Sequence, residues 1–215
     1  EAMNLINTLI AGVSIGAVYS LIAFALILVW RSTRVVNFAQ AGQAAFSTYV
    51  GLSIEKAFGN YWLALLVAII AGVLVGAFVE VVIVRFIVKR ATSAATATVA
   101  PVIAMLGLLG IFQGLMGLIW GGDYQPYPTA FSRDGISIAG TQIPFSPSDL
   151  FVLLTVVVAM SIAAIIFQRT SLGLSMRAAA FAPEVTRLSG IRVSRIRTLG
   201  WAFAGGAGEI GRAHV

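Results

Sequence analysis

Long apolar runs without charged residues alternate along the chain with short segments that carry the charges. The charge-free runs cover residues 2–30, 35–54, 57–79, 91–122, 150–168 and 198–208. A helix needs about 20 mainly apolar residues to cross the hydrocarbon core of a bilayer. Five of these runs reach or approach that length, and the sixth stops short. The pattern therefore predicts an all-α, polytopic membrane helix bundle with five full transmembrane helices and a truncated sixth.

The expected spans cover about residues 5–30, 36–53, 61–84, 96–120 and 149–167, and the sixth begins near Thr198. Between the fourth and fifth spans, residues 121–148 hold most of the prolines and are expected to form a loop. Pairs of glycines four residues apart let helix backbones approach closely, which favours a tightly packed bundle. Such pairs occur at Gly12 and Gly16, Gly72 and Gly76, Gly110 and Gly114, and Gly117 and Gly121.

Composition supports a membrane protein. Hydrophobic residues make up 59% of the chain and charged residues 10%, whereas a soluble domain has about 45–50% and about 25%. The absence of cysteine excludes a disulfide framework and thiolate metal sites. The net charge of +6 comes from basic residues between the spans, where they set topology, so no nucleic-acid partner is expected.

The basic clusters predict one orientation. The connection after the third span carries Arg85, Lys89 and Arg90, and residues 169–197 carry six arginines. Because short basic loops stay in the cytoplasm, both connections are expected inside, and residues 121–148 and the N-terminus outside. Trp30, Trp62, Trp120 and Trp201 stand near expected span ends, where tryptophan favours the membrane interface. We expect a multi-pass protein of the cell (inner or plasma) membrane.

The second span is far more polar than its neighbours. Asn37, Gln40, Gln43 and Ser47 follow a spacing that places them roughly on one helical face. Polar side chains are costly against lipid, so this face is expected to point into the bundle. Two interpretations remain open. The face either bonds helices together or lines a pathway for a zwitterionic or amide-bearing solute.

The segment 169–197 predicts two helices that meet near Ala182. Residues 171–181 are rich in helix-forming residues. Pro183 suits the first turn of a second, short helix, Glu184 suits its positive N-terminal end, and Gly190 suits its stop. Val185 and Leu188 would form a small apolar face beside Arg187. Such an element can dock into a groove on a soluble partner, or lie on anionic lipid.

The only acid within an apolar stretch is Glu80. It is expected to pair with Arg85 or to extend towards the interface; a role in proton coupling is the alternative. The sequence contains no phosphate-binding loop of the ATPase type, and no metal, triad or paired-carboxylate pattern. No enzyme activity, cofactor or metal is therefore expected.

The last seven residues, EIGRAHV at 209–215, break the final apolar run abruptly. They match the translation of a common short-read sequencing adapter, and are excluded from functional reasoning as an artefact. Residues 1–208 are expected to form the N-terminal, incomplete part of a transmembrane domain that includes the loop 169–197.

Several segments in order resemble the permease subunits of branched-chain amino acid ABC transporters, a group that also handles urea and short amides. The matching residues are the opening segment 4–21, Val36-Asn-Phe-Ala39, the acidic–basic stretch 79–85, Ser171-Leu-Gly173, Met176-Arg-Ala178, Pro183-Glu184 and Leu188-Ser-Gly-Ile191. The family pattern continues after Ala39 with His-Gly, where this chain has Gln40 and Ala41.

The resemblance implies an ATP-driven importer of branched-chain or other amino acids. In such importers two permease subunits form the pathway in the lipid bilayer, and a solute-binding protein delivers the solute from outside. ABC ATPase subunits would dock on the short helix of this chain, with Arg177, Pro183, Glu184, Arg187 and Gly190 as the coupling residues. The alternatives are a urea or short-amide permease, and a secondary transporter or facilitator with Glu80 as its coupling residue. An intramembrane enzyme has no nucleophile–base pair to support it.

Overall fold

A computed structural model describes residues 2–123, 125–132, 134–138, 141–143 and 145–212. The helices are α1 (Ala2–Thr33), α2 (Gln40–Phe58), α3 (Tyr61–Phe78), a π-helical segment (Val79–Val84), α4 (Arg85–Arg90), α5 (Ala94–Trp120), α6 (Pro147–Arg169), α7 (Ser171–Phe181), α8 (Pro183–Leu188) and α9 (Val193–Arg212). The strands β1 (Ile136–Ile138) and β2 (Thr141–Ile143) form an antiparallel hairpin. The predicted helical membrane bundle is confirmed, and in the described part of the expected loop 121–148 the structure adds this hairpin and the start of α6 at Pro147.

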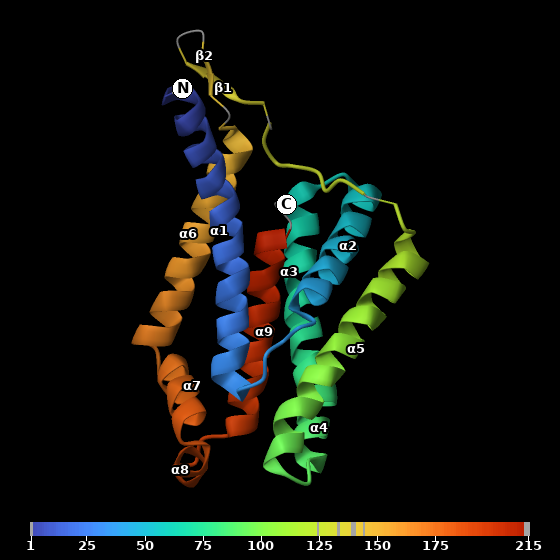
Figure 1. Cartoon of the computed structure of the whole chain (residues 1–215), viewed down its shortest axis with the longest axis vertical. Helices are drawn as coiled ribbons and strands as arrows, with labels where there is room; N and C mark the ends of the chain where they lie inside the picture. The colour runs from blue at the N-terminus through green and yellow to red at the C-terminus, as the bar shows by residue number, and fades with distance from the viewer. Residues whose placement is uncertain (1, 124, 133, 139–140, 144, 213–215) are drawn as a thin grey trace.

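The long helices run roughly along one axis (Figure 1). Helix α9 packs against both α1 and α3, so the last helix of the chain lies at the centre of the bundle. Helix α6 packs on the outer side of α1, whereas α5 contacts α2 and α4 on the opposite side. Segments far apart in the sequence therefore build the centre together.

Four helices in the described part of the chain are long and apolar enough to cross a membrane. They are Ile15–Thr33 of α1, the continuous helix Tyr61–Arg90, Val99–Trp120 of α5, and α6. The expectation of five full spans is met by four on this criterion, because α2 is too polar to qualify. It lies inside the bundle against α3, α5 and α9, which shield its polar side chains from lipid.

The basic connections gather at one end of the bundle. The end of α1, the end of α4, and helices α7 and α8 all lie at the lower end of Figure 1, whereas the hairpin and the N-terminus lie at the upper end. The guanidinium of Arg34 donates a hydrogen bond of 3.4 Å to the carbonyl of Ala180, which joins the end of α1 to α7. This arrangement agrees with a single orientation set by basic loops.

Local capping explains where several helices begin and end. The Ser146 side chain and Asp149 form a reciprocal capping box at the start of α6, with Pro147 at its first position. At the start of α3, the side chain of Asn60 accepts a hydrogen bond from the Leu63 amide at 3.1 Å. Gly59, with φ of 62°, ends α2 in the left-handed region that favours glycine.

The closest helix contact in the bundle is built on glycine. A Cβ atom added to Gly72 would lie 2.7 Å from the carbonyl oxygen of Gly205, and one added to Gly76 would meet the Trp201 carbonyl. Glycines at 12, 16, 110, 114 and 117 have no such neighbour in the described part of the chain. Of the predicted glycine pairs, Gly72 and Gly76 therefore form the close helix contact, between α3 and α9.

Trp201 corrects one expectation. Its side chain is 1% exposed and belongs to the main core cluster, and its indole nitrogen donates a hydrogen bond of 3.2 Å to the Thr33 hydroxyl. It is a core residue between α9 and the end of α1, and does not anchor the membrane interface. A tryptophan near a span end takes either place, and only packing distinguishes them.

Candidate functional site

The polar helix α2 starts partway along the bundle. Arg34 has a φ of 59°, which ends α1 with a reversal of the chain. The next residues, 35–39, are not helical, and yet Val35, Asn37 and Ala39 are buried. Figure 1 shows this connection entering the bundle before α2 begins. Irregular backbone within a membrane protein is tolerated only where protein or a polar cavity surrounds it, so this segment has the character of an internal site.

Three side-chain amides meet at this point. The Asn37 side-chain nitrogen donates to Gln40 Oε1 at 2.8 Å and to Gln43 Oε1 at 3.2 Å. The Gln40 side-chain nitrogen in turn donates to the carbonyl of Ala204 on α9, at 3.0 Å. The exposed fractions are 1% for Asn37, 3% for Gln40 and 2% for Gln43. We call Asn37, Gln40 and Gln43 the amide cluster.

The amide cluster has spare donors. The side-chain nitrogen of Gln43 is buried and has no hydrogen-bond partner in the described part of the chain. Helix α2 begins at Gln40 without a side-chain cap on its first amides. A helix N-terminus carries partial positive charge, so the carboxylate or carbonyl oxygen of a solute is the group this arrangement can bind. Both functions predicted for the polar face, bonding between helices and contact with a solute, are compatible with the geometry.

The structure places the predicted path residues as follows. All four are buried, which confirms that they face the interior. The helix begins at Gln40 and not at residue 36, so Asn37 lies before the helix and joins the cluster from the irregular segment. Ser47 lies one turn beyond Gln43, where its hydroxyl donates to the Gln43 backbone carbonyl at 2.9 Å.

The outer end of the same face of α2 is covered by the loop after α5. The Tyr127 hydroxyl is buried, without a partner in the described residues, and would lie 3.1 Å from a Cβ added at Gly51. Lys56 on α2 donates to the Gln125 side-chain oxygen at 2.5 Å, which fastens this loop. Burial raises the pKa of the Tyr127 phenol above its usual value. The sequence pattern showed Tyr127 only as a loop residue, because loop packing leaves no periodic signal.

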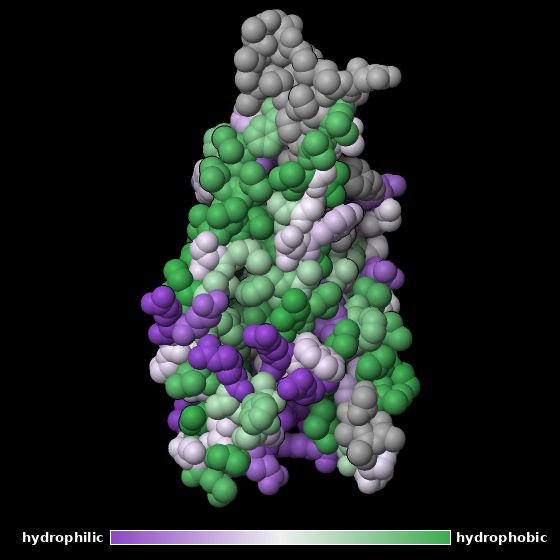
Figure 2. Space-filling view, turned by 60° about the vertical axis from the view of Figure 1, so that its left-hand side comes forward, coloured by the Kyte–Doolittle hydropathy of each residue, from purple (hydrophilic) through white to green (hydrophobic). Residues whose placement is uncertain are grey.

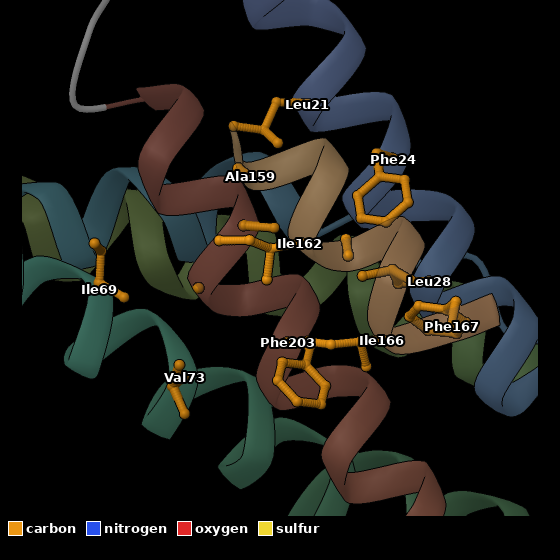
Figure 3. Close-up of a pocket in the computed structure, with 13 residues that line it drawn as sticks. Leu21, Phe24, Leu28, Ile69, Val73, Ala159, Ile162, Ile166, Phe167 and Phe203 are labelled. Carbon is orange, nitrogen blue, oxygen red and sulfur yellow. The ribbon is translucent and has the colours of Figure 1, made fainter. Parts of the chain in front are cut away.

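A separate pocket opens between α1, α3, α6 and α9 (Figure 3). Its volume is about 330 Å³, and side chains such as Phe24, Ile162 and Phe203 point into it. All thirteen lining residues are apolar or glycine. It offers no side-chain hydrogen bond to a zwitterion, which favours the amide cluster over this pocket as a contact for a polar solute.

The predicted pair of short helices is confirmed at the lower end of the bundle. Helix α7 covers Ser171–Phe181 and α8 covers Pro183–Leu188, with Ala182 between them. Gly190 has a φ of 81° and its amide donates to the Arg187 carbonyl at 3.0 Å, while the Ile191 amide donates to the Thr186 carbonyl at 3.2 Å. This pair of bonds is a Schellman motif and explains why α8 stops where it does.

Large apolar side chains project from this pair into solvent. The exposed fractions are 89% for Phe181, 88% for Leu188 and 62% for Val185. In the same segment of the chain, the arginines at 177, 187, 192 and 195 are also exposed. We call Phe181, Val185 and Leu188 the apolar knob. Phe181 was not predicted from the sequence, because it ends α7 and falls outside the expected face of α8.

The predicted coupling residues divide between framework and surface. Pro183 occupies the start of α8 and Gly190 its stop, so both shape the backbone. Glu184 and Arg187 are exposed on α8. Arg177 is exposed on α7, and its guanidinium donates to the Phe167 carbonyl at the end of α6. On the face shown in Figure 2, hydrophilic residues gather towards this lower end, below a hydrophobic body.

Glu209 lies within the described residues and is buried in α9, where its Oε1 accepts a hydrogen bond of 2.8 Å from the Thr48 hydroxyl. Because Glu209 belongs to the tail expected to come from adapter sequence, its carboxylate carries no part of the candidate site.

Comparison with known proteins agrees with the family resemblance found in the sequence. A family described as "Branched-chain amino acid transport system / permease component" matches residues 8–210. The chain is 29% identical over 190 residues to the probable branched-chain amino acid transport permease protein LivH of Methanocaldococcus jannaschii. That match covers 86% of this chain and 58% of the relative, so the chain spans less than two thirds of that relative's length. No solved structure matches the chain.

Proposed function

The chain belongs to the permease family of branched-chain amino acid transport systems, and on this premise we propose that it is a permease subunit of an ATP-driven amino acid importer. Its role is to form part of the solute pathway and to couple that pathway to ATPase subunits. The partners are ABC ATPase subunits, a second permease subunit and a solute-binding protein. The proposed location is the cell (inner or plasma) membrane.

The observation that carries this proposal is the apolar knob. A monomeric surface rarely exposes several large apolar side chains together unless a partner covers them. Here three such side chains lie within residues 181–188, exposed arginines occur in the same segment, and the segment lies at the end where the basic connections gather. The face complements a groove that is apolar at its centre and acidic at its rim, on a soluble partner. A helix that only lay on anionic lipid would not need the packed turn between α7 and α8.

The test of the whole proposal is ATP-dependent uptake. The full-length gene product should be reconstituted in vesicles with the ATPases and the solute-binding protein encoded beside it. Uptake of a branched-chain amino acid should require ATP inside and binding protein outside. Uptake that persists without the ATPases would contradict the proposal and favour a secondary transporter or facilitator.

The charges on α8 supply a first prediction. The double variant Glu184→Arg/Arg187→Glu keeps the net charge and reverses the pattern on the surface that faces the ATPase. We expect weaker association with the ATPase and a loss of uptake of about tenfold, because like charges then face each other across the interface. The measurement is co-purification with the ATPase together with initial uptake rate. An unchanged assembly and rate would remove these two residues from the interface.

The amide cluster supplies a second prediction, on the proposal that Asn37, Gln40, Gln43 and Ser47 line the solute pathway. Gln43→Leu removes the spare donor while Asn37 keeps its bond to Gln40. We expect the maximal uptake rate to fall about tenfold, the cost of one hydrogen bond to a charged group. Gln113→Leu on α5 is the matched control, because Gln113 is exposed and far from the cluster in sequence. Equal uptake by the two variants would assign the cluster a purely structural role.

Glu80 bears on the alternative of an ion-driven transporter. Its carboxylate is bonded to Arg85 and to Thr198, and this supports a structural role over proton coupling. The urea and short-amide alternative concerns the solute alone. A binding screen on the solute-binding protein encoded beside this gene distinguishes amino acids from amides.

We also propose that residues 1–208 are the N-terminal part of a longer transmembrane domain, and that 209–215 derive from a sequencing adapter. Sequencing across the native locus tests both statements. An open reading frame that continues past Gly208 with other residues supports them, and a genomic EIGRAHV at this position contradicts the second.

A further inference from the structure

An ion pair between the buried Glu80 and the partly exposed Arg85 joins the lower end of the continuous helix Tyr61–Arg90 to the beginning of α9. Glu80 is 1% exposed, and its carboxylate accepts two hydrogen bonds from the Arg85 guanidinium, at 2.7 Å and 3.4 Å. The Thr198 hydroxyl donates to Glu80 Oε2 at 2.7 Å, and Arg85 donates to the Thr198 hydroxyl oxygen at 2.9 Å. Arg85 also reaches the Ser194 carbonyl, at 3.2 Å. We call Glu80, Arg85 and Thr198 the latch.

The π-helical segment makes the ion pair possible. Residues five apart are about 140° apart around an ordinary α-helix, so their side chains point to different sides. In the π-helix Val79–Val84 the Arg85 amide bonds to the carbonyl of Glu80, which brings these two residues onto one face. A π-turn is rare and often accompanies a functional site. The π-turn therefore allows the Arg85 guanidinium to donate two hydrogen bonds to the Glu80 carboxylate.

The latch residue Thr198 is close in the chain to α7 and α8, the two short helices that we call the coupling element. Helix α9 starts at Val193, three residues after the glycine that ends α8. Val193 and Ile196 are buried against Met176 and Ala179 of α7, so the first turns of α9 pack on the helix that ends with Phe181 of the knob. The half-buried Thr198 then bonds α9 to Glu80 in the π-helical segment after α3. A displacement of α7 is therefore transmitted to α9 directly, as it is to α1 and α6, which also contact α7.

Beyond the latch, α3 and α9 remain in contact along their glycines, and α9 reaches the amide cluster. The close approach of Gly72 and Gly76 to Gly205 and Trp201 continues the contact upward. The carbonyl of Ala204 then accepts the bond from Gln40. A series of contacts therefore leads from α7 through α9 to the proposed solute pathway.

We propose that Glu80, Arg85 and Thr198 are positioning residues that hold α3 and α9 together as one rigid unit, so that movement of the coupling element is transmitted to the amide cluster. This inference rests on the proposed function. Cutting the latch removes the side-chain bonds between the π-helical segment and the first turns of α9, so the lower end of α9 can shift while the glycine contact above it remains. ATP hydrolysis then proceeds without a matching change in the pathway.

The experiment measures solute imported per ATP hydrolysed, in vesicles that contain the full-length permease and its partners. Glu80→Gln and Arg85→Met should each lower this ratio about tenfold while the ATPase remains bound and active. The exchange variant Glu80→Arg/Arg85→Glu should recover part of the ratio. A side chain needed only for folding would lower uptake and hydrolysis together and leave the ratio unchanged.

Two milder variants at Thr198 test the role of the latch if the charge variants do not fold. Thr198→Ser keeps the hydroxyl and should retain the wild-type ratio, whereas Thr198→Val is nearly the same size and should lower it. Equal ratios for serine, valine and wild type overturn the latch while leaving the importer intact. Wild-type vesicles without ATP-dependent uptake overturn the proposed function itself.

Discussion

Replacing Leu188 with aspartate is expected to separate the permease from its ATPase. The Leu188 side chain is 88% exposed at the end of α8, so the substitution removes little contact inside the described part of the chain. If a partner buries this side chain as an anchor, its loss costs at least about 2 kcal/mol, which weakens association about 30-fold. A carboxylate facing an acidic rim adds to the loss. The measurement is the dissociation constant of the ATPase for the full-length permease in lipid nanodiscs.

The matched control for this prediction is Leu188→Met, which keeps an apolar side chain of similar volume and should bind nearly as well as wild type. Phe181→Asp should resemble Leu188→Asp, because Phe181 belongs to the same knob and is 89% exposed. Thermal stability should be unchanged in all three variants. Wild-type affinity in both aspartate variants would mean that the knob is not the ATPase contact, and the role of the coupling element would have to be abandoned.

Among glycine-to-alanine substitutions in the described part of the chain, Gly205→Ala is expected to lower the stability most. A Cβ atom at this position would collide with the backbone carbonyl of Gly72, and a backbone group cannot move aside as a flexible side chain does. Overpacking of this kind costs about 3 kcal/mol, near the upper end of the usual range. We expect a lower melting temperature and a smaller folded fraction in detergent.

The control for Gly205→Ala is Gly114→Ala on α5. Gly114 is also a membrane-helix glycine in a pair with four-residue spacing, but an added Cβ there meets no other group within 4 Å in the described residues. This substitution should leave stability unchanged or raise it slightly, because alanine favours a helix over glycine. Equal melting temperatures for the two variants would contradict the close contact between α3 and α9.

Local signals in the sequence predicted the coupling element closely. The boundaries of α7 and α8 depend on groups within a few residues of each other, namely the proline at the start of α8 and the glycine with positive φ after it. Such preferences act on the backbone directly and need no distant partner. The exposure of Phe181 was missed, because whether the end of a helix is covered depends on the rest of the fold.

The candidate pathway was predicted in part. The burial of Asn37, Gln40 and Gln43 follows from the cost of polar groups against lipid. The late start of α2, and the bond from Gln40 to Ala204 on α9, do not follow from that rule. The bond joins residues 164 positions apart, and no spacing within one helix encodes such a contact.

By itself, the amino-acid sequence determined a membrane bundle, the helices of which it consists and the end at which the basic residues gather. These properties are sums over local hydrophobicity and charge, and water and lipid impose them on each segment separately. Only the tertiary structure decided which glycine pair brings two helices together, that Trp201 is a core residue, and that Glu80 pairs with Arg85 across a π-turn and accepts a bond from Thr198 of α9. Each of these is a choice among neighbours of similar polarity, and close packing of particular side chains makes that choice.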